Sequence, residues 1–140
     1  MLEILTPSNA RPLVRPLLAV SVSAGHPCPA DDHYDQLLDL NQHLISHPQH
    51  TYFVRVQGES MINAGIHDGD LLIVDRAISP RSGHVVIAHL NGELTVKRIQ
   101  ITDGAVLLLP ENPAYPAITV TKEMQFDVWG IVTNVIHALA

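Results

Sequence analysis

Residues 84–101 read HVVIAHLNGELTVKRIQI, two largely apolar stretches separated by Asn91-Gly92. Asn-Gly favours a two-residue type I′ turn, because both residues tolerate the positive φ that this turn requires. The stretch therefore predicts a β-hairpin, with strands over residues 84–90 and 93–101. This is the strongest local structural signal in the chain, and it places Lys97 in the second strand of the hairpin.

Further strands are expected on both sides of this hairpin, at residues 52–56, 71–75, 105–109, 117–120 and 126–136. A helix is expected over roughly residues 34–47, where leucines follow helical spacing. Asp31 or Asp32 would cap this helix, and Pro48 would end it. The expected fold is therefore mostly β, with one short helix.

The first thirty residues differ from the rest because five prolines interrupt them, at positions 7, 12, 16, 27 and 29. Proline lacks an amide donor, so this segment is expected to form neither a long helix nor an inner strand. We expect an extended N-terminal arm over residues 1–30 and a β-rich domain over residues 31–140. Disorder of the whole arm is the alternative.

Composition sets limits on the protein class. A chain of 140 residues with 46% hydrophobic residues can bury the core of one domain. The net charge of −6 argues against direct, sequence-specific DNA binding, because phosphate contacts need a basic surface. The single cysteine, Cys28, excludes an internal disulfide and favours a reducing, cytoplasmic compartment. No apolar stretch is long enough to span a bilayer, so no membrane contact is expected.

Ser60 and Lys97 are the residues whose positions suggest chemistry. Ser60 follows a strand in Gly58-Glu59-Ser60-Met61, and Lys97 is one of only two lysines. A serine nucleophile needs a base, and a lysine buried without a carboxylate can serve as one because burial lowers its pKa. The backbone amides of Glu59 and Ser60 are candidates for an oxyanion hole. Two structural alternatives stay open: Ser60 caps a short helix, or Lys97 extends from the sheet edge into solvent.

Other catalytic and metal-binding arrangements have weaker support. A Ser-His-Asp triad is possible by composition, but the residues around Ser60 lack the second glycine of a nucleophile elbow. His43, His47 and His50 have helical spacing, yet no cysteine or carboxylate completes a ligand set around them. We therefore expect neither a metal nor a cofactor.

Three motifs together resemble the self-cleaving Ser-Lys peptidases of LexA-type repressors and UmuD-type SOS mutagenesis proteins. They are Gly58-Glu59-Ser60-Met61, the strand Gly69-Asp70-Leu71-Leu72-Ile73-Val74-Asp75, and Thr95-Val96-Lys97-Arg98. The resemblance covers nearly the whole chain and is strongest to the UmuD type. It implies a β-rich catalytic domain like that of LexA and signal peptidases, with Ser60 as nucleophile and Lys97 as general base. It also implies cleavage in the arm between a small residue and glycine, which Ala24-Gly25 fits.

The same resemblance implies a biological role. A RecA filament on single-stranded DNA would stimulate cleavage, and the processed homodimer would act as accessory subunit of an error-prone, UmuC-like Y-family polymerase in translesion synthesis. An arm of thirty residues is too short for the helix-turn-helix domain of LexA, so repression of an operator is not expected. Two alternatives remain: a non-enzymatic β-rich binding module, and a non-enzymatic regulator that heterodimerises with a LexA-like repressor.

Overall fold

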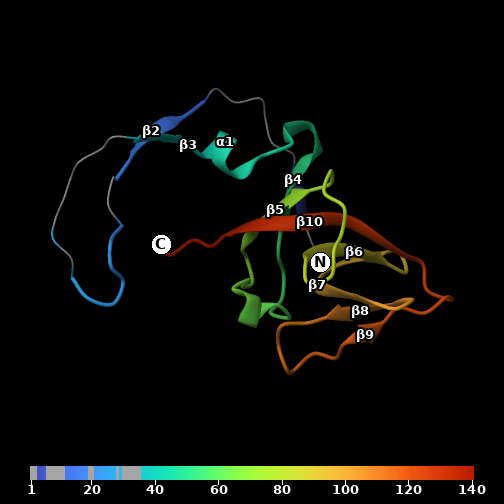
Figure 1. The fold of residues 1–140 in the computed structure, drawn as a ribbon. Coiled ribbons are helices and arrows are strands. Elements are labelled where there is room, and N and C mark those ends of the chain that lie inside the picture. The colour runs from blue at the N-terminus through green and yellow to red at the C-terminus, as the bar shows by residue number, and fades with distance from the viewer. Residues whose placement is uncertain (1–2, 6–11, 19–20, 28, 30–35) are drawn as a thin grey trace. The chain divides into compact units, whose positions relative to one another are not determined.

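The computed structural model describes residues 3–5, 12–18, 21–27, 29 and 36–140 (Figure 1). The chain divides into two compact units. The first consists of residues 1–8 and 47–140, and the second of residues 9–46. Each unit is described by itself below.

The first unit is built on one antiparallel sheet, in which the described residues form eight strands (Figure 1). The strand order across the sheet is β1-β4-β5-β10-β6-β7-β8-β9. The bounds of the strands are β1 Glu3–Leu5, β4 Thr51–Arg55, β5 Leu71–Asp75, β6 Val85–Leu90, β7 Glu93–Thr102, β8 Ala105–Leu109, β9 Ile118–Thr119 and β10 Phe126–Ile136. Two 3₁₀ helices accompany the sheet, η1 Pro48–His50 and η2 Ile62–Ala64. The expectation of a mostly β fold is confirmed.

The hairpin expected from Asn91-Gly92 joins β6 to β7. Asn91 and Gly92 have φ values of 51° and 84°, as a type I′ turn requires. The turn is also held from outside, because the Asn91 side-chain oxygen accepts a hydrogen bond from the Gln125 amide at 3.0 Å. Pairing starts at Leu90 and Glu93, directly beside the turn, and continues to Val85 and Arg98. The predicted hairpin is therefore confirmed.

Strand β10 lies between β5 and β6 and has two register shifts, one near Gly130. A Cβ atom placed on Gly130 would lie 2.5 Å from Cγ1 of Val74 in β5, so only glycine allows this close approach.

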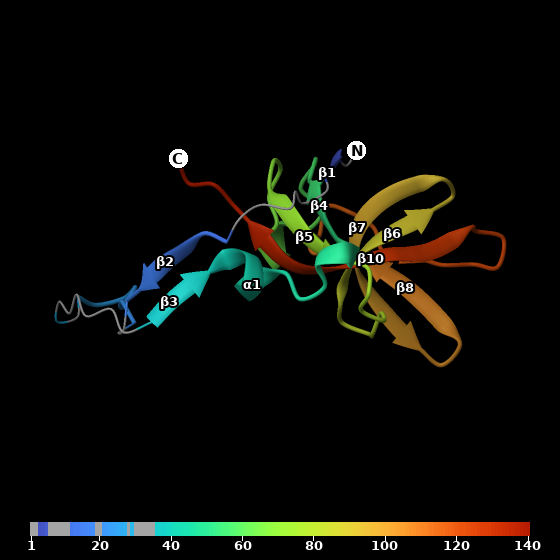
Figure 2. The ribbon, with the colours of Figure 1, turned by 90° about the horizontal axis from the view of Figure 1, so that it is seen from above.

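The sheet is strongly twisted (Figure 2). Two clusters of buried side chains form the core: Val54, Val56, Met61, Ile66, Leu72, Val74, Ile87 and Val96 in one, and Val86, Ala88, Ile99, Leu108 and Ile131 in the other.

The second unit contains a two-stranded ribbon and a short helix. Strand β2 (Val14–Leu17) pairs antiparallel with β3 (Gln36–Asp39), and α1 (Leu40–Leu44) follows directly. The first part of the predicted helix over residues 34–47 is wrong, because residues 36–39 pair with β2 instead. Residues 34 and 35 lie outside the described residues.

The cap and the end of α1 also differ from expectation. The side chain of Asp39 caps the helix by accepting a hydrogen bond from the Asn41 amide at 3.0 Å. Asp31 and Asp32, the predicted caps, lie outside the described residues. The helix ends before the extended residue Ile45, earlier than Pro48, which instead begins η1. Across the segments that the structure describes, no helix has the length and apolar character needed to cross a membrane.

Candidate active site

Ser60 lies in the loop between β4 and β5, immediately before Met61 and η2. Met61 is buried in the core, while Ser60 stays partly exposed. Gly58 allows a sharp turn two residues before Ser60, because its φ of 98° is readily adopted only by glycine. Its amide donates a hydrogen bond to Asp68 Oδ1 at 2.7 Å. The N-cap residue of η2 is Met61, without a side-chain bond, so the helix-capping alternative for Ser60 is not supported.

Residues 111 and 112 hold the Ser60 loop in place. The Glu111 amide donates to the Ser60 carbonyl at 2.8 Å, and the Glu111 carbonyl accepts from the Asn63 amide at 2.8 Å. The Asn112 side chain donates to the Glu59 carbonyl at 2.8 Å. These bonds fix the backbone on both sides of the serine. Sequence reasoning missed Glu111 and Asn112, because no local pattern connects them with Ser60.

The same loop is tied to the strand that carries Lys97. Arg98 Nε lies 2.5 Å from Glu111 Oε1, and Arg98 also donates to the Gly83 carbonyl at 2.6 Å. Both side chains of the ion pair are about one third exposed, so the pair adds little to the free energy of unfolding. Its main effect is to fix the position of the two segments that carry Arg98 and Glu111. Through Glu111, the Ser60 loop and strand β7 are held against one another.

Lys97 extends from β7 with its amino group inside the protein, and only 8% of the residue is exposed. Its Nζ donates to Thr95 Oγ1 at 2.9 Å, to the Val96 carbonyl at 3.1 Å and to Ser60 Oγ at 3.2 Å. None of the ion pairs found in the described part of the chain includes Lys97. The alternative of a lysine extending into solvent does not agree with this burial.

Burial without a carboxylate has an electrostatic consequence for Lys97. It lowers the pKa of the ammonium group from its ordinary value of 10.5, because desolvation disfavours the charged form. A neutral Lys97 at 3.2 Å from Ser60 Oγ can accept the hydroxyl proton directly. Thr95 lies two residues before Lys97 in β7 and therefore on the same strand face, and its hydroxyl group helps to orient the amine.

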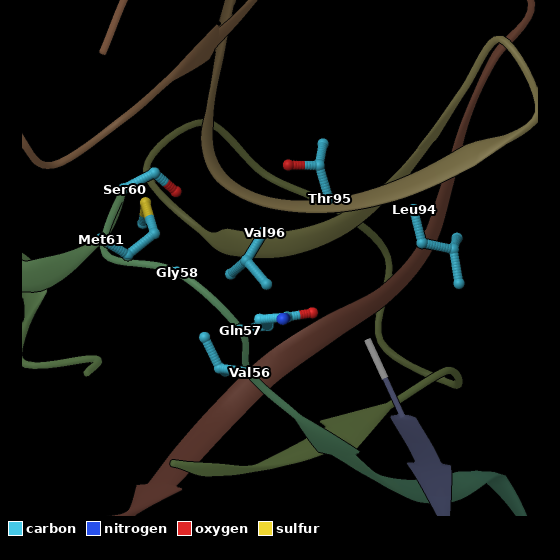
Figure 3. A pocket seen from close by; sticks show the side chains of 8 residues that line it. All are labelled: Val56, Gln57, Gly58, Ser60, Met61, Leu94, Thr95 and Val96. Atoms are coloured by element: carbon cyan, nitrogen blue, oxygen red, sulfur yellow. The ribbon is translucent and has the colours of Figure 1, made fainter. Parts of the chain in front are cut away.

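The amides of Glu59 and Ser60 have no hydrogen-bond partner among the residues that the structure describes. Unpaired amides beside a serine are the groups that an oxyanion hole requires. A small pocket adjoins them, lined by residues of two segments: Val56, Gln57, Gly58, Ser60 and Met61 from the loop, and Leu94, Thr95 and Val96 from β7 (Figure 3). Within this pocket the hydroxyl groups of Ser60 and Thr95 point toward one another above Val96 (Figure 3).

The other predicted residues lie elsewhere or have other partners. Ala24 and Gly25 are exposed in the segment that joins β2 to β3, which belongs to the other unit. Cys28 lies outside the described residues. Among the described histidines, none hydrogen bonds to Ser60, and His47 instead pairs with Asp75 at 2.6 Å. A triad at Ser60 therefore has no support from these contacts.

Comparison with known proteins agrees with the resemblance found in the motifs. Residues 16–133 match the Peptidase S24-like family. Protein ImpA of Salmonella typhimurium is 44% identical over 137 residues, which cover 94% of this chain and 89% of ImpA. Protein SamA, also of Salmonella typhimurium, is 46% identical over 122 residues, which cover 87% of this chain and 84% of SamA. The LexA repressor of Paracidovorax citrulli is 43% identical over 125 residues, covering 89% of this chain and 55% of the repressor.

The family match includes the Ser60 loop, strand β5 and strand β7, where the three motifs lie. Each of the three relatives aligns with more than four fifths of the chain. The expected resemblance is thereby confirmed, and the chain belongs to the Peptidase S24-like family, with the UmuD-type proteins and the LexA repressors.

Proposed function

We propose that the protein is a self-cleaving serine peptidase that cuts its own Ala24–Gly25 bond, with Ser60 as nucleophile and Lys97 as general base. The observation that carries this proposal is the distance of 3.2 Å between Lys97 Nζ and Ser60 Oγ, at a lysine that is buried and has no carboxylate partner in the described structure. This arrangement supplies the activated hydroxyl that peptide hydrolysis requires.

The reaction proceeds in two steps. Neutral Lys97 takes the proton of Ser60, whose oxygen attacks the Ala24 carbonyl carbon, and the amides of Glu59 and Ser60 stabilise the resulting oxyanion. The Ala24–Gly25 bond breaks, and Lys97 returns its proton to the amine of Gly25. A water molecule, deprotonated by Lys97, then hydrolyses the ester between Ala24 and Ser60. The products are residues 1–24 and residues 25–140.

The role we propose in the cell is that of the UmuD type. A RecA filament on single-stranded DNA stimulates cleavage by favouring the conformation in which the arm occupies the site. The processed homodimer then serves as accessory subunit of a UmuC-like Y-family polymerase in the cytoplasm. The similarity to ImpA and SamA over most of both chains supports this role.

The pH dependence of cleavage tests the proposed chemistry. Below the folded pKa of Lys97, the neutral fraction of this lysine rises about tenfold per pH unit, so the first-order cleavage rate should rise in parallel and then level off. Because the pKa of Lys97 is lowered, the midpoint of this rise lies below pH 10.5. Mass spectrometry of the full chain, incubated over a series of pH values, would show a fragment that begins at Gly25.

Two matched pairs of variants provide controls. Ser60→Ala should stay intact at every pH, whereas Ser79→Ala, at an exposed serine, should be cleaved normally. Lys97→Ala should stay intact as well, and Lys122→Ala, at the other and exposed lysine, should not. An intact wild-type mass after long alkaline incubation would contradict self-cleavage. At neutral pH, addition of RecA with single-stranded DNA should accelerate cleavage of the wild-type chain and of the two control variants, but not of Ser60→Ala or Lys97→Ala.

A substitution at Gly25 tests the proposed scissile bond. A Cβ atom at Gly25 meets no atom within 4 Å, and the residue is exposed, so Gly25→Val should leave the melting temperature unchanged. The bulkier residue next to the bond would displace it from Ser60 and slow cleavage by about 100-fold. Cleavage by mass spectrometry and thermal unfolding by circular dichroism measure the two effects. Normal cleavage of Gly25→Val would place the scissile bond elsewhere.

A further inference from the structure

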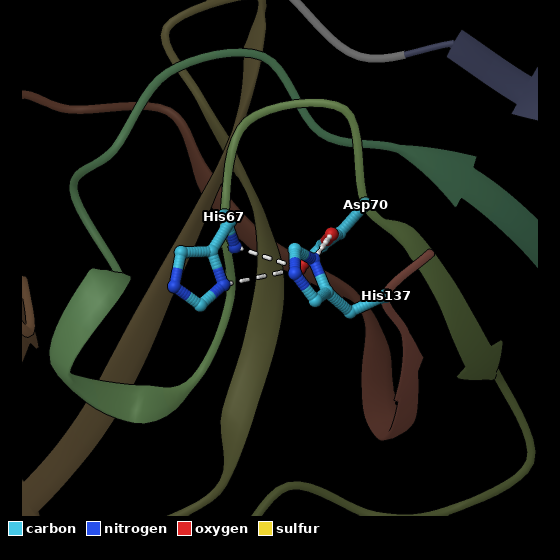
Figure 4. Close-up of side chains that lie close together, drawn as sticks. All are labelled: His67, Asp70 and His137. Carbon is cyan, nitrogen blue, oxygen red and sulfur yellow. Dashed lines mark hydrogen bonds and ion pairs between the residues drawn. The ribbon is translucent and has the colours of Figure 1, made fainter. Parts of the chain in front are cut away.

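His67, Asp70 and His137 converge in the first unit, outside the Ser60 pocket (Figure 4). His67 and Asp70 belong to the turn that leads into β5, and His137 follows the last residue of β10. His137 Nδ1 lies 2.5 Å from Asp70 Oδ1, and His67 Nδ1 lies 3.6 Å from Asp70 Oδ2. The two imidazole rings are 4.7 Å apart, centre to centre. Two segments far apart in the sequence thus contribute three potential metal ligands.

Asp70 supplies a buried negative charge at the centre of the cluster, since only 3% of it is exposed. Its carboxylate accepts a hydrogen bond from the His67 amide at 2.7 Å and lies within hydrogen-bond distance of His137 Nδ1. A buried anion of this kind is stabilised by a cation placed beside it.

His67 provides the second observation. Its Nδ1 atom is buried and has no hydrogen-bond partner among the residues that the structure describes. Buried polar atoms without a partner are rare in native proteins, because each loses its hydration without compensation. This nitrogen faces Asp70 and the ring of His137 (Figure 4), but its contact with Asp70 Oδ2, at 3.6 Å, is too long for a hydrogen bond. One ion between the three side chains would satisfy this nitrogen and the carboxylate together.

We propose that His67, Asp70 and His137 bind a divalent transition-metal ion such as Zn²⁺, through Nδ1 of each histidine and a carboxylate oxygen. The three ligand atoms lie within 4.8 Å of one another. Ligands of tetrahedral zinc are about 3.3 Å apart, so small side-chain rotations bring all three to bonding distance. Two imidazoles with one carboxylate favour zinc over calcium or magnesium, which prefer oxygen ligands.

The exposure of the cluster allows an ion to enter and to keep a water ligand. The side chains of His67 and His137 are 44% and 43% exposed, respectively, whereas Asp70 lies on the buried side of the cluster. Three protein ligands with one open position match a four-coordinate zinc site. On binding, Nδ1 of His137 would coordinate the ion in place of its hydrogen bond with Asp70.

The bound ion would connect the residues after β10 to the turn before β5. That turn is bonded to the segment leading to Ser60, because the Val56 amide donates to the Asp70 carbonyl at 2.9 Å and the Gly69 amide donates to the Val56 carbonyl at 2.8 Å. Metal binding would therefore stabilise the turn before β5 and the segment that leads to Ser60. The inference stands independently of the proposed peptidase activity.

Titration of the full-length chain with Co²⁺ and with Zn²⁺ tests the site. Co²⁺ should give the visible absorption of a tetrahedral complex at one equivalent, and Zn²⁺ should displace it and raise the melting temperature. His67→Gln and His137→Gln should each weaken Zn²⁺ binding, measured by calorimetry, by about 10-fold or more. His89→Gln, at an exposed histidine of β6 outside the cluster, should bind as wild type does.

Two outcomes would overturn the proposal. In the first, neither ion binds the wild-type chain at one equivalent. In the second, the doubly substituted His67→Gln/His137→Gln chain binds Zn²⁺ as tightly as wild type. Either result would leave the cluster as a hydrogen-bonded group that joins two segments of the domain. Circular dichroism of the variants confirms that each chain is folded before titration.

Discussion

Lys97→Met is expected to abolish cleavage at Ala24–Gly25 and, at the same time, to stabilise the folded domain. Methionine is unbranched and fills the space of the lysine stem, but it cannot accept the proton of Ser60. Lys97 and Ser60 act together in the proposed reaction, so the loss of Lys97 should lower the cleavage rate by about 10,000-fold or more. The buried charge disappears with it, so the free energy of unfolding should rise by about 0.5–2 kcal/mol.

The sign of the stability change follows from the pKa of Lys97. In the folded state this pKa lies below 10.5, so the unfolded chain binds more protons between the two values. The destabilisation from Lys97 is complete below its folded pKa and disappears as the pH rises toward 10.5. The advantage of Lys97→Met is therefore largest below the folded pKa of Lys97 and vanishes in strong alkali.

Urea unfolding at a neutral and an alkaline pH, together with mass spectrometry of the incubated chain, measures both effects. Lys122→Met is the matched control, because Lys122 is exposed, and it should change neither stability nor cleavage. Cleavage that persists in Lys97→Met would mean that another group is the base. A loss of stability would mean that the hydrogen bonds of Lys97 to Ser60 and Thr95 outweigh its desolvation.

Gly130→Val is expected to have the largest effect on stability. The new Cβ would lie 2.5 Å from Cγ1 of Val74 and 3.2 Å from Cγ of Arg76, and valine adds two further methyl groups. Strands β5 and β10 would have to separate in the middle of the sheet. Overpacking of this kind should lower the free energy of unfolding by about 3 kcal/mol or more.

A double substitution makes this prediction specific. Val74→Ala removes the nearest atom, so the combination Val74→Ala/Gly130→Val should be more stable than the sum of the two single changes predicts. Urea denaturation curves of all four chains give the interaction free energy. Gly25→Val is the matched control, because no atom lies within 4 Å of a Cβ there. Additive effects would show that the contact with Val74 is not the cause.

The sequence predicted the parts of the fold that depend on local chemistry. The hairpin at Asn91-Gly92 was predicted correctly because the turn residues themselves set the backbone geometry. The helix over residues 34–47 was predicted too long, because residues 36–39 have helical spacing but find a partner in β2. The residues of β2 and β3 that pair are 19 to 25 positions apart. The spacing of residues within one segment cannot predict such a pairing.

In the candidate site, too, the contacts set by local sequence could be predicted and those between distant segments could not. Strand alternation places Thr95 and Lys97 on one face, so the contact of Thr95 with the amine was open to sequence reasoning. The motifs suggested Ser60 and Lys97 as a pair, and their catalytic roles stay predictions. The backbone bonds from Glu111 carry no signature in residue type. His67 and His137 are seventy positions apart, so their meeting at Asp70 depends on the register of β10 with β5.

The proposed cleavage at Ala24–Gly25 would make the pairing of β1 with β4 intermolecular. Among the described residues, Glu3, Ile4 and Leu5 pair β1 with β4, and they lie on the fragment that the proposed cleavage would separate from the domain. Before the cut, the connecting chain keeps the local concentration of β1 high, and after it the strand becomes a dissociable peptide. Its departure would leave the outer backbone groups of β4 open, as an edge to which a strand of another protein can add. Hydrolysis of one bond would thus release β1, which acts as an intramolecular ligand of β4, and leave the edge of β4 free to recognise another protein.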